Sequence, residues 1–141
     1  MILWRLCRRP FAGLSGEGGR LAAGRWHTQG QPIVYMAAEP SLCVLGVRVN
    51  LSLHFEDLPR DYVLLRIETN GADLEELNKL PEKPREFGDA WLHAQRSALL
   101  CVPSVIVPQA RNILLNPAHS QAAQVRIAAI TPFAFDARLW P

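Results

Sequence analysis

The sequence has little of what builds disulfide frameworks, zinc sites or membrane spans. Its three cysteines, Cys7, Cys43 and Cys101, are odd in number, far apart and set among apolar neighbours. They lack the CxxC spacing of a zinc site, so we expect reduced packing residues and no bound metal. The longest charge-free run, Ser97–Ala110, has 14 residues and contains two prolines. A transmembrane helix needs roughly 20 apolar residues, so we expect no membrane contact.

Several motifs of catalysis and nucleotide binding are also missing. There is no GxSxG sequence, which argues against an α/β-hydrolase nucleophile. Neither a P-loop Lys-Ser/Thr pair nor a GxGxxG that opens a helix is present, which disfavours P-loop and Rossmann folds. No basic run extends beyond Arg8–Arg9, so direct DNA binding is disfavoured. No HxxxH pair exists, and we expect surface or loop positions for the four isolated histidines, His27, His54, His93 and His119.

Length and composition predict one soluble domain. The chain has 141 residues, of which 49% are hydrophobic and 20% are charged, as in ordinary globular proteins. A chain of this length buries roughly 70% of its unfolded surface, enough for one real core. The N-terminus has four apolar residues before its first arginine and places its other charges after them. This order is the reverse of a secretory signal, so we expect a cytoplasmic protein with one domain over residues 1–141.

The charged residues are unevenly distributed along the chain. Residues 1–55 carry a net charge of +4, residues 56–90 of −5, and residues 91–141 of +3. Two basic ends therefore flank an acidic middle. This pattern favours a small anionic ligand held by the ends over a continuous nucleic-acid-binding stripe.

Short apolar runs outnumber helical patterns. An acidic helix or turn is predicted over Asp73–Asn78 and a helix over Phe87–Gln95. Glu39–His54 is ambiguous, because Pro40 suits a first helical turn while the apolar residues alternate as in a strand. Clear strands are predicted over Met1–Leu6, Pro32–Ala37, Asp61–Thr69, Ala98–Val102, Val105–Val107, Asn112–Leu115 and Gln124–Ile130. This balance predicts the α+β class, with an open or split sheet.

A glycine-rich segment, Gly13–Ala37, is the most unusual part of the chain. It holds six of the nine glycines together with Arg20 and Arg25. Glycines let backbone N–H groups approach an anion and arginines add forked donors, which favours a phosphate ligand. A plain surface loop is the alternative. Trp26 has either a packing role or a stacking role beside Arg25, and Ser104 is a polar residue between two apolar runs.

Five motifs in order resemble the RES-domain family, the toxin half of bacterial Xre–RES toxin–antitoxin pairs. The resemblance covers nearly the whole chain, and several motifs at family-like spacing are more specific than any one alone. The motifs are WRL at Trp4–Leu6, GLSGEGGRLAAGRWHTQGQPIVYMA at Gly13–Ala37, FGDAWL at Phe87–Leu92, SALLCVPSVIVPQARNILLNPAH at Ser97–His119 and PFAFDARLW at Pro132–Trp140.

The resemblance implies a compact domain with a split mixed sheet, similar to ADP-ribosyltransferase domains, that binds NAD as a substrate in a cleft. Such toxins consume NAD by hydrolysis or phosphorolysis of the nicotinamide–ribose bond, or transfer ADP-ribose to a protein. The implied partner is an Xre-type antitoxin in a hetero-oligomer, which masks the cleft. Contact with DNA is implied only through that antitoxin.

The family is named for an Arg, a Glu and a Ser. The resemblance places the Arg on Arg25 in GRW, and an accompanying Tyr on Tyr35 in IVYMA. The Ser falls on Ser104 in VPS, with Ser97 in SALL as the other candidate. Arg25 would clamp the NAD diphosphate and Tyr35 would stack on a ring. The implied NAD-binding set is Arg20, Gly24, Arg25, Trp26 and Tyr35.

The chain departs from the family pattern at the Glu. Family members read like LLEVLVHL where this chain reads VLGVRVNL, Val44–Leu51, so Gly46 stands at the position of the Glu. The comparison also implies a helix over Pro40–Leu51. Loss of one contact to the transition state typically costs about 10²–10³ in rate, so this chain is expected to be a crippled toxin. The alternative is a non-catalytic RES fold, kept for antitoxin binding and operator autoregulation.

Overall fold

The computed structural model describes Met1–Pro141, with seven strands, three α-helices and four single-turn 3₁₀ helices. No helix has both the length and the apolar character required to cross a bilayer. In chain order the elements are β1 (Ile2–Arg8), α1 (Glu17–Leu21), β2 (Val34–Ala37), α2 (Pro40–Asn50), β3 (Tyr62–Glu68), β4 (Leu74–Glu76), α3 (Pro84–Ala94), β5 (Leu99–Pro103), β6 (Arg111–Leu115) and β7 (Arg126–Pro132). The 3₁₀ turns are Arg9–Phe11, Phe55–Asp57, Ala122–Gln124 and Ala137–Leu139.

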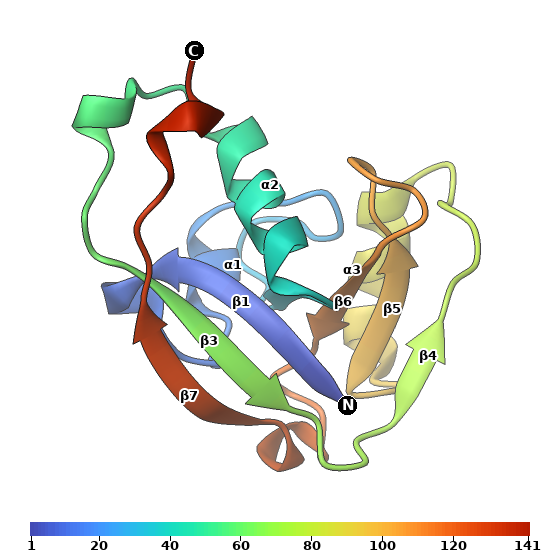
Figure 1. Ribbon diagram of the computed structural model, residues 1–141. Helices are drawn as coiled ribbons and strands as arrows, with labels where there is room; N and C mark the ends of the chain where they lie inside the picture. The colour runs from blue at the N-terminus through green and yellow to red at the C-terminus, as the bar shows by residue number, and fades with distance from the viewer.

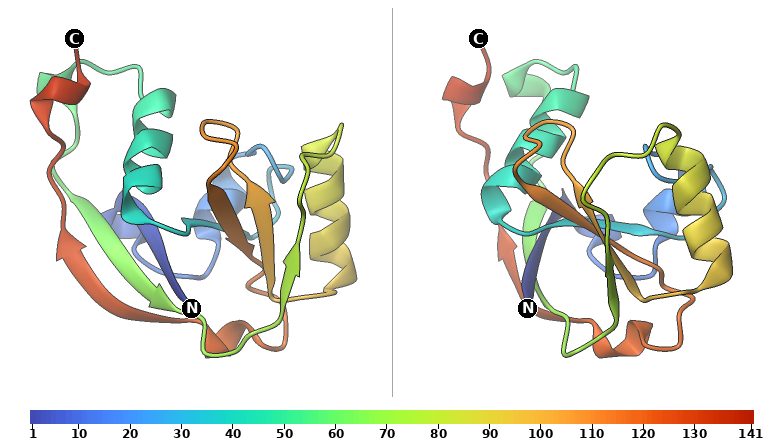
Figure 2. Two further views of the ribbon diagram at one scale, coloured as in Figure 1. Left: turned by 45° about the vertical axis from the view of Figure 1, so that its right-hand side comes forward. Right: turned by 90° about the vertical axis from the view of Figure 1, so that its right-hand side faces the viewer.

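The strands form one mixed sheet that is nearly divided in two. Its order is β4-β5-β6-β2-β1-β3-β7, and β4–β5 is the only parallel pair. β1 and β3 pair over seven residues, whereas β1 and β2 are joined by the single pair Trp4 and Ala37. The half-sheets β4-β5-β6-β2 and β1-β3-β7 therefore diverge, with α2 above the gap between them (Figure 1, Figure 2). The predicted split α+β fold is confirmed.

Burial on both sides of the sheet explains why the central strands are continuous runs of apolar residues. The largest cluster draws side chains from both half-sheets, among them Leu65 of β3 and Leu99 of β5. On the opposite face of β5 and β6, Trp91 of α3 packs with Leu100 and Leu114. Both faces of β5 are thus buried, and an alternation of apolar and polar residues has no place there.

A smaller cluster joins α2 to the C-terminal tail. Phe135 is buried, and Trp140 packs against the same cluster. The Trp140 indole donates from Nε1 to the carbonyl of Leu53 at 3.1 Å, and the Arg48 guanidinium lies 4.6 Å from the ring centroid. The apolar C-terminal tail therefore packs against α2. These contacts fix α2, which forms one wall of the cavity described below.

Of the two alternatives for Glu39–His54, the strand suggested by the alternating apolar residues is wrong. The helix implied by the family resemblance is confirmed. α2 spans Pro40–Asn50, with proline in its first turn. The alternating apolar residues do not alternate in burial, because Leu45 and Val49 are 38% and 60% exposed on the same helix. Leu45 and Val49 lie one turn apart on an exposed face of the helix. The alternation of apolar residues therefore does not reflect a strand with one buried face.

Two shorter segments also differ from their predictions. Val105–Val107 is a turn and not a strand, because the Ser104 hydroxyl accepts from the backbone N–H groups of Ile106 and Val107 and bends the chain. The predicted helix or turn at Asp73–Asn78 contains β4 instead, where Leu74 pairs with Leu99. That pairing is a long-range contact, which local propensity does not encode. The three cysteines are unpaired, and Cys101 is buried, as expected.

Two glycines in helix interiors give a matched stability prediction. A Cβ at Gly88 of α3 would lie 1.8 Å from the Trp26 carbonyl oxygen, whereas a Cβ at Gly46 of α2 would meet nothing within 4 Å. Gly88→Ala should therefore lower the free energy of unfolding by about 1–3 kcal/mol through overpacking. Gly46→Ala should raise it by about 0.5–1 kcal/mol through helix propensity. Urea denaturation measures both, and equal effects of the two substitutions would contradict the packing.

Candidate active site

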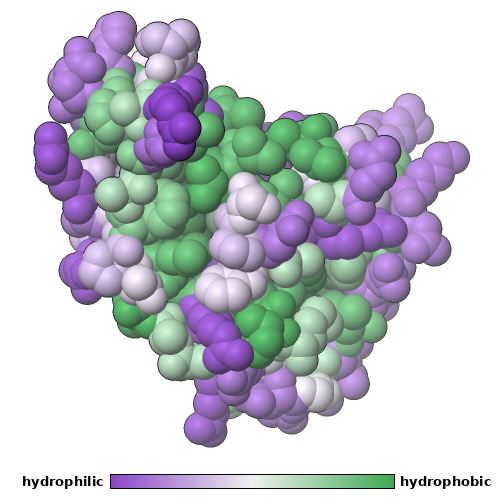
Figure 3. Space-filling model, viewed as in Figure 1, coloured by the Kyte–Doolittle hydropathy of each residue, from purple (hydrophilic) through white to green (hydrophobic).

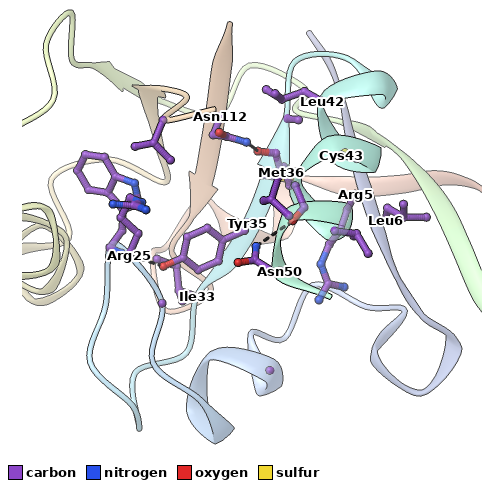
Figure 4. A pocket seen from close by; sticks show the side chains of 18 of the residues that line it. Arg5, Leu6, Arg25, Ile33, Tyr35, Met36, Leu42, Cys43, Asn50 and Asn112 are labelled. Atoms are coloured by element: carbon purple, nitrogen blue, oxygen red, sulfur yellow. Dashed lines mark hydrogen bonds between the residues drawn. The ribbon is translucent and has the colours of Figure 1, made fainter. Parts of the chain in front are cut away.

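A large cavity opens where the sheet divides. Its volume is about 890 Å³, and it is lined from β1, the glycine-rich segment, β2, α2 and the turn after β5. Figure 4 shows Arg25 and Tyr35 on one side, with Arg5, Cys43 and Asn50 on the other. On the face of the molecule seen in Figure 3, apolar side chains gather over the middle and hydrophilic ones lie mostly toward the edges. Its volume lies within the usual range for ligand pockets.

The cavity lining is cationic. It contains three arginines, Arg5, Arg25 and Arg85, and no aspartate or glutamate. Arg5 is half-buried and donates from Nη1 to the Gly13 carbonyl at 2.9 Å, which fixes its guanidinium beside the glycine-rich segment. Arg85 of α3 donates from Nε to the Gly24 carbonyl at 3.1 Å. Such a lining suits an anionic ligand.

Tyr35 is held by its hydroxyl and not only by its ring. Its oxygen accepts from the Trp26 backbone N–H at 3.1 Å and lies 2.7 Å from His27 Nδ1. Burial of the side chain raises the pKa of Tyr35 to about 12, although the hydrogen bond from Trp26 and the charge of Arg85 favour the phenolate. Tyr35 therefore stays neutral across the physiological range.

The glycine-rich segment approaches Tyr35 too closely for side chains. A Cβ at Gly24 would lie 2.5 Å from the Tyr35 hydroxyl oxygen, and one at Gly19 would lie 2.7 Å from Cγ2 of Ile33. Both glycines are thus needed for packing, whatever ligand the cavity takes. The segment also contains α1, so it is not the plain loop that its composition suggests.

Helix α3 holds the other side of the segment. Gly88 contacts the Trp26 backbone, and Asp89 accepts from the Thr28 N–H at 2.9 Å and from the Thr28 hydroxyl. The Trp26 indole packs edge-on against Phe87, with ring centroids 6.3 Å apart. Arg25 is therefore carried by a segment fixed on both sides, although its own side chain is exposed.

Gly46 lines the cavity from α2 and leaves it open. A side chain there would meet no other group within 4 Å. The Asn50 side chain donates from Nδ2 to the Gly46 carbonyl at 2.8 Å. Glu39 precedes the helix and does not line the cavity, so it supplies no carboxylate near position 46.

The two candidate serines both lie outside the cavity lining. Ser104 is buried and shapes the turn that brings Val105 and Ile106 to the cavity. Ser97 lies in the core, where it donates to the Leu99 carbonyl at 2.7 Å and accepts from the Trp91 indole. Only Ser104 adjoins the site.

The structure places two of the residues predicted to bind NAD away from the open part of the cavity. Arg20 is exposed, lies 3.7 Å from Glu17 and does not line the cavity. Trp26 lines it, but the residue is 3% exposed and its indole packs on Phe87, so the ring has no open face for stacking. Nor is a group of three or more His, Cys, Asp or Glu side chains placed to hold a metal ion.

The comparisons with known proteins agree with the fold. The RES domain profile matches residues 2–136. The chain belongs to the RES domain family. A toxin named Toxin Res from Pseudomonas putida is 41% identical over 150 residues, which cover 99% of this chain and all of that protein. A protein from a Sphingobium species named Prs ADP-ribosylating toxin is 35% identical over 140 residues, covering 89% of this chain and 86% of its own.

A solved structure resembles this RES domain in three dimensions. It is the crystal structure of the M. tuberculosis MbcT–MbcA toxin–antitoxin complex, with a TM-score of 0.74. The match covers 94% of this chain and 83% of that chain at 16% identity, a level that establishes likeness of fold alone.

Sequence reasoning missed three residues of this RES domain cavity. His27 was expected on the surface, but it is 2% exposed and contacts Tyr35. Arg5 is predicted only as part of the strand Met1–Leu6, and no role is predicted for Arg85. The WRL motif was the one available signal for Arg5. The burial of His27 has no local signal, because it depends on the chain folding back onto Tyr35.

The alkaline titration of the two tyrosines tests the burial of Tyr35. Because its pKa is raised to about 12, Tyr35 should ionise last, and Tyr35→Phe should remove the later phenolate step in an ultraviolet absorbance titration. In the unfolded chain tyrosine ionises near pH 10. Between these two pKa values only the folded form keeps the proton. The contribution of Tyr35 to the free energy of unfolding is therefore complete below about pH 10 and is lost as pH rises toward 12. A single early step for both tyrosines would contradict the structure.

Proposed function

We propose that this chain is the toxin of a toxin–antitoxin pair and that its cavity binds NAD. One observation carries the proposal: Arg25 of the glycine-rich segment, Tyr35 of β2 and the position of the family Glu on α2 line one cationic cavity. The names of the relatives support the reading, since one is an ADP-ribosylating toxin and another is Toxin Res. NAD is the donor substrate that ADP-ribosylation requires.

The residues present suit the charged part of NAD. The diphosphate is an anion, and a forked guanidinium binds two of its oxygens at once. Arg25 is the proposed clamp, with Arg5 and Arg85 adding positive charge to the same lining. Tyr35 offers an aromatic ring whose hydroxyl is already hydrogen-bonded, so the ring serves as a platform for a nicotinamide or ribose group.

The reaction we propose is cleavage of the bond between nicotinamide and ribose. Nicotinamide leaves with the bonding electrons, positive charge develops on the ribose, and water, phosphate or a protein side chain then forms the new bond at that carbon. A carboxylate near the ribose stabilises this charge. Position 46 is the place for it, and Gly46 supplies none. The chain thus has the parts for binding, while its rate should be low.

The proposed partner is an Xre-type antitoxin, which would connect the complex to DNA. Three apolar side chains at the cavity mouth are exposed when the chain is on its own. Val49, Val105 and Ile106 are 60%, 44% and 37% exposed. Exposed apolar groups around a pocket are typical of interaction sites, and a protein seated there would also block NAD.

A second candidate function is non-catalytic antitoxin binding. Gly46 favours it, because the one position that the family assigns to a carboxylate is empty of any side chain. Calorimetric titration with NAD combined with a nicotinamide-release assay separates the two. Release of nicotinamide establishes a consuming enzyme, and binding of the antitoxin with neither NAD affinity nor release establishes the interaction protein.

Arg25→Ala tests the diphosphate clamp. The variant should lose NAD binding in calorimetry, because a charged hydrogen-bonding group is worth about 1.5–3 kcal/mol. The fold should be unaffected, because the exposed Arg25 side chain makes no hydrogen bond or ion pair within the protein. Its circular dichroism and melting temperature should match those of the parent. Arg20→Ala is the matched control, since Arg20 lies on the same segment outside the cavity. Unchanged NAD affinity in Arg25→Ala would refute the clamp.

Three substitutions at Gly46 test the missing carboxylate. Gly46→Glu should raise NAD consumption by about 10²–10³, since it restores one transition-state contact, and cells should stop growing unless the antitoxin is co-expressed. Open space at position 46 accommodates the side chain. Gly46→Gln matches its size without the charge and Gly46→Ala matches only the helix propensity, so both should leave cellular NAD unchanged. Equal NAD levels after induction of all three would refute the role of position 46.

A further inference from the structure

His27 is a buried side chain whose hydrogen bonds are fully defined. It is 2% exposed, and its Nε2 lies 2.9 Å from the Gly19 carbonyl oxygen and 2.8 Å from the Ala22 carbonyl oxygen. Carbonyl oxygens only accept, so Nε2 must carry the hydrogen. In the neutral ring Nδ1 is then a bare acceptor, and it faces the Tyr35 hydroxyl.

The Tyr35 hydroxyl is defined by the same logic. It accepts from the Trp26 backbone N–H and lies 2.7 Å from Nδ1 of His27. With Nδ1 as an acceptor, the only hydrogen between the two groups is that of the hydroxyl, which Tyr35 donates to His27. The hydroxyl proton therefore points into the protein, and the cavity meets the ring of Tyr35 and not a proton donor.

We propose that His27 is a positioning residue of the NAD site, which in its Nε2–H form joins the end of α1 to the Tyr35 hydroxyl and so sets Arg25 and Tyr35 relative to each other. The proposal rests on the proposed NAD-binding function. Its role for the reaction is indirect, since the imidazole points at protein groups on both sides.

The glycine-rich segment needs such a connection. α1 has five residues, two of them glycines, and its carbonyl groups at Gly19 and Ala22 have His27 as a partner. Helices this short and glycine-rich are unstable alone, and unpaired carbonyls at a helix end are costly when buried. Arg25 lies between Ala22 and His27, so whatever fixes both ends of this stretch fixes the backbone that carries its guanidinium.

A double-substitution cycle tests the coupling. His27→Gln keeps an amide that can donate to the carbonyls near α1 but removes the acceptor for Tyr35, while Tyr35→Phe removes the hydroxyl and keeps the ring. Each should weaken NAD binding about tenfold, as expected for one buried polar group left unpaired. The double variant should be no weaker than Tyr35→Phe alone, because loss of the hydroxyl already removes the bond to His27 along with the one from the Trp26 N–H. Losses that multiply to about a hundredfold would overturn the proposal.

His119→Gln is the matched control. The His119 Nδ1 also accepts one hydrogen bond, from the backbone N–H of Gln121, but the residue lies outside the cavity. This variant should bind NAD like the parent. If it weakens NAD binding as much as His27→Gln does, the loss is a general effect of removing a loop histidine and the proposal fails.

A spectroscopic readout separates this proposal from the proposed function. Nitrogen-15 NMR of the free protein should show the His27 ring hydrogen on Nε2, with the signal assigned by its disappearance in His27→Gln. A slowly exchanging hydroxyl proton of Tyr35 should vanish in both His27→Gln and Tyr35→Phe. An Nδ1–H form or a doubly protonated ring would overturn the positioning proposal even if NAD binds. The predicted spectra without any NAD binding would refute the NAD site alone.

Discussion

The narrow join between β1 and β2 is the constraint on which the cavity depends. Only Trp4 and Ala37 pair there, so the two half-sheets separate beyond that point. α2 follows directly from β2 and spans the gap, held on the other half-sheet by the Cys43 thiol, which donates to the Trp4 carbonyl at 3.3 Å. A fully paired sheet would bring these strands about 4.8 Å apart and leave no room for a ligand.

Charge and shape in this cavity have different origins. The positive lining comes from three separate parts of the chain, with Arg5 on β1, Arg25 on the glycine-rich segment and Arg85 on α3. The shape comes from apolar packing behind them, notably Trp26 against Phe87 and Gly88. The groups that supply the charge are therefore separate from those that hold the fold, and Gly46 adds open volume to the cavity.

The sequence predicted those parts of the fold that depend on local pattern. Strands with continuous apolar runs, such as Leu99–Pro103, were predicted because burial on both faces leaves a run of apolar residues in the sequence. β4 was missed, since three residues pair only because β5 is already in place. The alternation of apolar residues around Val49 suggested a strand for a related reason. An exposed apolar residue at a cavity mouth cannot be told from a buried one by its residue type.

The candidate site divides in the same way. Motifs predicted Arg25, Tyr35 and Gly46, which all line the cavity. The burial of His27 could be found only in the folded chain, because its three partners lie in different parts of the structure. The glycines of this segment were expected to admit a phosphate, but Gly19 and Gly24 are needed first for contact with Ile33 and Tyr35. A segment fixed before the ligand arrives has no ordering entropy left to lose on binding. Its glycine content, costly in the unfolded chain, is thus consistent with a rigid wall that carries Arg25, not with a flexible loop that closes over the ligand.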